Sequence, residues 1–148
     1  MIREIKCNIW DKLNENSAVC ILTNETIYNN KNVMGGGIAK EAALRNPNLK
    51  FKCAECIVND KFSLGIDKVS GAEMLRFSTK DNVWEDSKLN IIEMSLIKLR
   101  HYCNLNPNKT IYLPRPGCGL GGLDWETQVK PLCEKYLNNL DNLFITYM

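Results

Sequence analysis

The sequence predicts an α/β protein in which helices cover both faces of a mixed central sheet, giving a three-layer α/β/α sandwich. Two observations predict this class. Short apolar, β-favouring runs alternate with amphipathic stretches, and clusters of glycine lie where predicted strands give way to helices. With 148 residues, the chain is large enough to bury a core without disulfides or metal. We therefore expect a single domain over residues 1–148.

The predicted strands are recognised by alternating or continuous apolar residues. Residues 2–9 alternate apolar and polar side chains, whereas residues 18–22 are continuously apolar and suit a central strand covered on both faces. Residues 111–113 form a further buried strand that Pro114 and Pro116 end, because proline cannot donate a ladder hydrogen bond. Other short strands are expected at residues 57–58, 63–68, 73–77 and 143–147, with a hairpin turn at residues 69–71.

Caps, breakers and apolar stripes predict the helices. One follows Gly37 and ends near Arg45 and Asn46, because Pro47 disfavours helical geometry at the residue before it. Ser87 is expected to cap a long helix, and Asp124 a last helix that begins near Trp125. The expected buried stripes are Leu89, Ile92, Leu96, Leu99 and Cys103 on the long helix, and Val129, Leu132, Cys133, Tyr136 and Leu137 on the last.

A glycine-rich loop joins the strand at residues 111–113 to the last helix. Gly117, Gly119, Gly121 and Gly122 permit positive φ angles and a close approach of the backbone to a ligand. Such a loop turns N–H groups outward, and a helix N-terminus behind it favours anions such as phosphate. A strand-to-helix connection with many glycines is the alternative interpretation of this loop taken alone.

A second cluster, Gly35, Gly36 and Gly37, leads into the alanine-rich first helix. Two such loops suit a ligand with two linked phosphates, held at the carboxyl ends of neighbouring strands in an open sheet. A dinucleotide-binding Rossmann fold is the rival, with Asp60 as its ribose-binding acid. That fold requires Gly-x-Gly-x-x-Gly close after a strand, whereas these glycines follow a polar segment, residues 23–32, that we expect to be a loop. We therefore predict a diphosphate site of another kind.

Composition and charge narrow the function classes. With a formal charge of +2 and a pI near 8.1, the chain is less basic than domains that bind nucleic acid through their surface. No segment has the apolar length of a membrane span, and the N-terminus lacks the apolar core of a signal peptide, so we expect a cytoplasmic protein. Seven cysteines without a disulfide pattern suit a reducing compartment. Cys53 and Cys56 have the spacing of half a zinc site, but no second ligand pair follows, and we expect no metal.

Together the two glycine loops resemble those of macro domains, the ADP-ribose-binding family, and the resemblance extends over nearly the whole chain. Residues 34–39 resemble the family's first phosphate loop and residues 114–126 its second. Asn8 and Ile9 take the place of an Asp-Ile pair that contacts adenine. The resemblance implies no cofactor. The ligand-binding residues that it implies are Asn8, Ile9, Met34, Gly35, Gly36, Gly37, Ile38, Pro114, Gly117, Cys118, Gly119, Leu120, Gly121, Gly122 and Leu123.

Within the family, the chain resembles the branch that contains the human terminal ADP-ribose glycohydrolase and the bacterial DarG antitoxin, which removes ADP-ribose from DNA. That branch has a Phe/Ile-x-Thr-Lys motif, then a polar segment and a long helix. The same order occurs here, with the motif at residues 77–80, the polar segment at residues 81–86 and the helix at residues 87–103. The resemblance implies that Lys80 is the catalytic lysine. A neutral amine would attack the ring-opened ribose, whereas a charged Lys80 would stabilise the leaving group. The human enzyme has an assisting acidic residue where this chain has Gly121.

Three functions are compatible with these residues. The first is hydrolysis of the bond that joins ADP-ribose to DNA or protein. The partner would then be ADP-ribose or the modified macromolecule, and we expect the enzyme to be a monomer. The second is an ADP-ribose 1''-phosphate phosphatase, which the first loop also resembles, although no phosphatase base is evident beside it. The third is a reader without turnover, which Gly121 favours. Cys118 lacks a histidine partner for thiol catalysis, and Asp124 is first a helix cap and second a candidate for proton transfer.

Overall fold

The computed structural model describes residues 1–148 and contains a six-stranded mixed sheet. The strand order is β1-β8-β7-β2-β6-β5, and every neighbouring pair is parallel except β5 and β6. A separate hairpin is formed by β3 (Ile27–Tyr28) and β4 (Lys31–Asn32). The strands of the main sheet are β1 (Glu4–Lys6), β2 (Ser17–Asn24), β5 (Ser63–Ile66), β6 (Glu73–Lys80), β7 (Thr110–Pro114) and β8 (Leu143–Tyr147).

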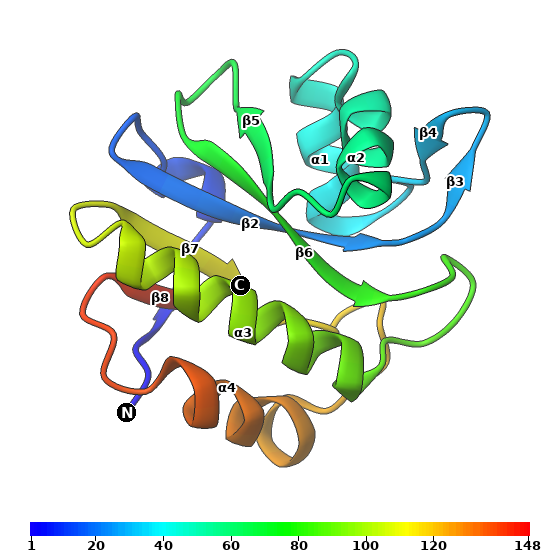
Figure 1. Cartoon of the computed structure of the whole chain (residues 1–148). Coiled ribbons are helices and arrows are strands. Elements are labelled where there is room, and N and C mark those ends of the chain that lie inside the picture. Colours follow the sequence, from blue (N-terminus) through cyan, green and yellow to red (C-terminus); the bar gives the residue numbers. More distant parts are fainter.

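Four α-helices cover the two faces of this sheet (Figure 1). One face carries α1 (Gly37–Arg45) and α2 (Leu49–Val58), and the other carries α3 (Leu89–Leu105) and α4 (Lys130–Leu137). A 3₁₀ helix (Ile9–Lys12) follows β1, and a π-helical turn (Trp125–Val129) precedes α4. The predicted class, an α/β/α sandwich with a mixed sheet, is confirmed. None of the helices combines the length and the apolar character that a membrane span needs.

The central strand β2 shows why helices are needed on both faces. Its side chains alternate, so Ala18 and Cys20 pack in the core under α3 and α4, while Val19 and Ile21 pack in the core under α1 and α2. All four are fully buried, at 0% exposure. A continuous apolar run thus becomes a strand with no solvent face, as the sequence predicted.

The strand predicted at residues 57–58 is wrong, because these residues end the helix α2. Leu49, Cys53 and Cys56 are the buried stripe of this helix, at the four- and three-residue spacing of one helical face. Both cysteines have partners in the core. The Cys53 thiol contacts the Asn32 side-chain oxygen at 3.3 Å, and the Cys56 thiol contacts the Ser63 carbonyl at 3.4 Å.

Two element boundaries differ from the prediction because a local hydrogen bond competes with regular structure. The strand predicted over residues 2–9 ends at Lys6, since the Asn8 side chain accepts a hydrogen bond from the Trp10 N–H at 3.1 Å and caps the 3₁₀ helix. Ser87 does not cap α3, which begins at Leu89 without a side-chain cap. The Ser87 N–H instead donates to the carbonyl of Gly121 at 2.9 Å.

The other helix boundaries agree with the sequence. The helix α1 ends at Arg45, before Pro47, as predicted. Asp124 is the N-cap of the last helical segment, and its carboxylate accepts hydrogen bonds from the Thr127 backbone at 2.9 Å and hydroxyl at 2.6 Å. The first turn after this cap is π-helical, and α4 begins at Lys130.

Candidate functional site

A cavity of about 1180 Å³ lies at the carboxyl ends of the parallel strands. Its walls come from segments that follow β1, β2, β6 and β7, and from the end of β8. Because the sheet order is β1-β8-β7-β2-β6, the segment after β1 lies at one end of the cavity and the segment after β6 at the other. The two glycine loops, which follow β7 and β2, lie between them.

The first glycine loop presents open backbone to the cavity. A Cβ atom added at Gly35 or Gly37 would meet nothing within 4 Å, and Gly37 has a positive φ of +57°. The helix α1 begins at Gly37, and its N-cap Gly36 offers no side chain to satisfy the first N–H groups. Uncapped N–H groups at a helix N-terminus, together with the helix dipole, favour anions such as phosphate.

A small asparagine network holds this loop in place. The Asn24 amide donates to the Val33 carbonyl at 2.7 Å and its oxygen accepts from the Asn32 amide at 3.0 Å. Both asparagines are buried, and Asn32 also donates to the carbonyl of Thr26 at 2.9 Å. The segment at residues 23–32, expected to be a loop, therefore extends β2 to Asn24 and then forms the β3–β4 hairpin.

The second glycine loop faces the first across the cavity. A Cβ atom at Gly36 would lie 2.7 Å from Leu120 Cδ1, which places the tip of the second loop directly against the first loop. Leu120 is nevertheless 79% exposed, so it covers the gap from the solvent side. Gly117 and Gly122 have φ angles of +74° and +78°. These positive angles favour glycine, as predicted from the sequence for this loop.

The β1 end of the cavity has an aromatic wall. Trp10 lines the cavity, and its indole N–H donates to Glu41 at 3.3 Å. The Arg45 guanidinium lies 4.1 Å from the centre of the Trp10 ring and is held in turn by two hydrogen bonds to the fully buried Asp67, at 2.9 and 3.3 Å. Burial opposes ionisation of Asp67, but the bonds from Arg45, Ser70 and Asn46 outweigh it and lower its pKa to about 2.

Most of the residues predicted to bind ligand line the cavity. The exceptions are Met34, which is buried in the core, and Gly122, which faces Asp86. Those that line it are Asn8, Ile9, Gly35, Gly36, Gly37, Ile38, Pro114, Gly117, Cys118, Gly119, Leu120, Gly121 and Leu123, together with Lys80. Other residues that line the cavity were not predicted from the sequence, among them Trp10, Glu41, Asp86 and Tyr147.

Comparison with solved structures places this arrangement among known folds. The macrodomain of Thermus aquaticus DarG superposes with a TM-score of 0.78 at 21% identity, over 100% of this chain and 98% of that one. The macrodomain of Mycobacterium tuberculosis DarG gives a TM-score of 0.75 at 23% identity, with 100% and 98% covered. The chain has the macrodomain fold. No protein-family model and no curated protein matches the sequence.

A third similar structure holds a ligand. Thermosipho africanus DarTG, solved in complex with ADP-ribose, superposes with a TM-score of 0.71 at 23% identity over 89% of this chain. The superposition covers 38% of that longer protein. All these identities are low, so the likeness shows the fold alone.

The β6 end of the macrodomain cavity carries Lys80, the last residue of β6. Its side chain is partly exposed and lines the cavity. Its amine forms no hydrogen bond with the protein and has no carboxylate within the 4.0 Å limit of an ion pair. Arg115, the other lining cation, is already paired with Glu4 at 3.0 Å and lies over the Tyr147 and Trp125 rings. Lys80 is therefore the one cation of the cavity that is free for a ligand.

The contact between Gly121 and Ser87 explains why position 121 carries no acidic side chain. A Cβ atom at Gly121 would lie 2.2 Å from Ser87 Oγ and 2.7 Å from the carbonyl oxygen of Gly117. Neither distance is possible for real atoms, so any side chain here would displace the backbone. The hydrogen bond from Ser87 to Gly121 fixes this close contact between the two segments.

Cys118 lies in the second loop, where its thiol contacts the Pro116 carbonyl at 3.3 Å. Burial raises the pKa of the thiol to about 11, against the lowering effect of Arg115. Such a thiol is almost entirely protonated at neutral pH and is a poor nucleophile. This agrees with the sequence, which offers no histidine partner beside it.

Proposed function

We propose that this macrodomain binds ADP-ribose, with the diphosphate between the two glycine loops. The order of segments along the sheet carries the proposal, because it places two anion-binding loops between an aromatic end and a lysine end. A nucleotide diphosphate sugar has the same order of chemical groups. A cavity of about 1180 Å³ is also large enough for a dinucleotide-sized ligand.

In this proposal adenine binds at the β1 end and the distal ribose at the β6 end. Ile9 and Trp10 supply an apolar and aromatic wall for a planar base, and Asn8 supplies a polar group. The Asn8 oxygen already accepts the Trp10 N–H, so its amide group is the donor left for the base. The distal ribose then reaches Lys80.

We further propose that Lys80 promotes hydrolysis of the bond between ADP-ribose and a modified DNA or protein. Lys80 is partly exposed and unpaired, so its ammonium group can donate a proton to the atom that leaves the ribose. General acid catalysis of this kind contributes roughly 10² to 10⁴ in rate. A neutral Lys80 amine that attacks the ring-opened ribose is the alternative route, and borohydride would trap its imine on Lys80.

A reader without turnover is the second candidate, and Gly121 is the observation that favours it, because position 121 has no room for an acidic side chain. A release assay separates the two. Wild type and Lys80→Ala are incubated with ADP-ribosylated DNA and with a protein modified on acidic residues, and free ADP-ribose is measured.

Release by the wild type, lost in Lys80→Ala, supports the hydrolase and identifies its substrate. If the wild type binds ADP-ribose but releases it from neither substrate, the result supports the reader function. Release at equal rates by both proteins refutes the role of Lys80. An ADP-ribose 1''-phosphate substrate included in the same assay tests the phosphatase.

A further inference from the structure

Four carboxylates line the cavity: Glu41, Glu85, Asp86 and Asp124. Three of them already accept hydrogen bonds from the protein. The donors are the Trp10 indole for Glu41 at 3.3 Å, the Asn82 side-chain amide for Glu85, and the Thr127 backbone for Asp124 at 2.9 Å. Glu85 also forms an ion pair with Lys88 at 3.1 Å. Asp86 has neither a hydrogen bond nor an ion pair with the protein. The cavity therefore holds one free carboxylate as well as one free cation.

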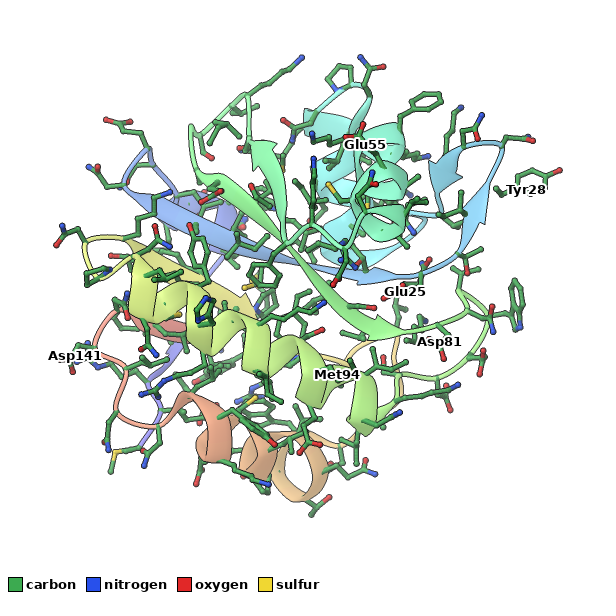
Figure 2. The ribbon with its side chains drawn as sticks, viewed as in Figure 1. Glu25, Tyr28, Glu55, Asp81, Met94 and Asp141 are labelled. Atoms are coloured by element: carbon green, nitrogen blue, oxygen red, sulfur yellow. The ribbon has the colours of Figure 1, made fainter.

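The segment that carries Asp86 is fixed at several points. The backbone carbonyl of its first residue, Asp81, accepts a hydrogen bond from the Glu25 N–H at 3.0 Å. The Val83 N–H donates to the Thr26 hydroxyl at 3.0 Å. Figure 2 shows Glu25 and Asp81 close together beside the end of β6. At the other end, the Lys88 N–H donates to the Thr79 carbonyl at 2.9 Å, so the segment returns to the strand that ends in Lys80.

The Asp86 side chain lies beside the second glycine loop. A Cβ atom at Gly122 would lie 3.1 Å from Asp86 Oδ1, so the absence of a side chain there leaves room for the carboxylate. The next residue, Ser87, occupies the space at Gly121. An acidic side chain has no room at Gly121, and the segment after Lys80 brings Asp86 beside the neighbouring Gly122.

We propose that Asp86 is the catalytic carboxylate that works with Lys80, an inference that rests on the proposed hydrolase. Asp86 takes a proton from the attacking water as the water oxygen bonds to the anomeric carbon of the distal ribose. The electron pair of the breaking bond goes to the leaving atom, which takes a proton from the Lys80 ammonium. The proton on Asp86 returns to Lys80 through solvent, which restores both groups. Lys80 and Asp86 both line the cavity and form no ion pair with each other.

The test compares Asp86→Asn with Asp81→Asn, an exposed aspartate on the same segment that does not line the cavity. We expect Asp86→Asn to lower the single-turnover release rate by about 10² or more, with the Kd for ADP-ribose within about threefold of wild type. Asp81→Asn should retain the wild-type rate. Formate should restore part of the rate of Asp86→Ala, because a small carboxylate can replace a lost base but cannot repair a misplaced loop.

Three outcomes would overturn the inference, and they are distinguishable. If wild type releases ADP-ribose and Asp86→Asn does so at the same rate, Asp86 has no catalytic role and the proposed hydrolase stands. If wild type releases none while it binds ADP-ribose, the proposed hydrolase fails and the role of Asp86 fails with it. A loss of rate in Asp86→Asn that is matched by weaker ADP-ribose binding, without formate rescue, would assign Asp86 to binding and refute catalysis.

Discussion

Substitution of Asp67 by Asn should destabilise the protein strongly, although Asp67 does not line the cavity. The two oxygens of this fully buried carboxylate accept from Arg45, from the Asn46 amide at 2.8 Å, and from the Ser70 backbone and hydroxyl at 2.9 and 2.6 Å. An asparagine keeps one acceptor oxygen, so in either orientation two N–H donors lose their partner. At about 1.5 to 3 kcal/mol for each bond to a charged group, the expected loss is about 3 to 6 kcal/mol.

Thermal unfolding followed by circular dichroism measures this loss. For a chain of this length, about 3 to 6 kcal/mol corresponds to a fall in Tm of roughly 10 to 20 °C. Asp141→Asn is the matched control. Asp141 pairs with Arg3 at 3.4 Å but its side chain is 98% exposed, and Figure 2 shows it at the edge of the molecule away from Asp81. The control should lose less than about 0.5 kcal/mol.

The same variant should weaken ADP-ribose binding, because Asp67 orients the Arg45 guanidinium that lies over Trp10. A Tm within about 2 °C of wild type would contradict the calculation, since it would mean that the buried donors find other partners. A large fall in Tm with unchanged ADP-ribose affinity would contradict only the link from Asp67 to the cavity wall.

Three further predictions test other parts of the structure. Because the pKa of Asp67 is lowered from 3.8 to about 2, its ionised form contributes roughly 2 kcal/mol of stability that is present above pH 4 and is lost as the pH falls towards 2; acid titration of wild type should show this loss and Asp67→Asn should not. Gly121→Ala should cost about 1 to 3 kcal/mol in urea unfolding, part of which Ser87→Gly should relieve, and an additive double mutant would contradict the contact. Cys118, with a pKa of about 11, should react with iodoacetamide at pH 8 about 100-fold more slowly than an ordinary thiol, as followed by mass spectrometry; rapid labelling would contradict its burial.

Those parts of the fold that depend on local sequence were predictable. The buried run at β2, the glycine turn before α1 and the Asp124 cap each follow from a few adjacent residues. The strand predicted at residues 73–77 is present but extends to Lys80, and the role of Lys80 came from a resemblance and stays a prediction.

The rest depends on contacts between distant segments. The sequence does not encode the strand order in any local pattern, and without that order the two ends of the cavity cannot be assigned. Ser87 has the residue type of a helix cap, yet its partner is Gly121 in another loop. Asp86 could not be chosen among the acidic residues of its segment, because only the structure shows which carboxylates already have partners.

The central claim, that one cavity binds ADP-ribose and Lys80 breaks its link to a macromolecule, is tested most directly by two constants from the same samples. These are the Kd for ADP-ribose and the single-turnover rate of its release, in wild type and in Lys80→Ala. We predict a rate lower by about 10² to 10⁴ in the variant, with Kd changed by less than about threefold. Equal rates in the two proteins, or a wild type that does not bind ADP-ribose, would contradict the claim.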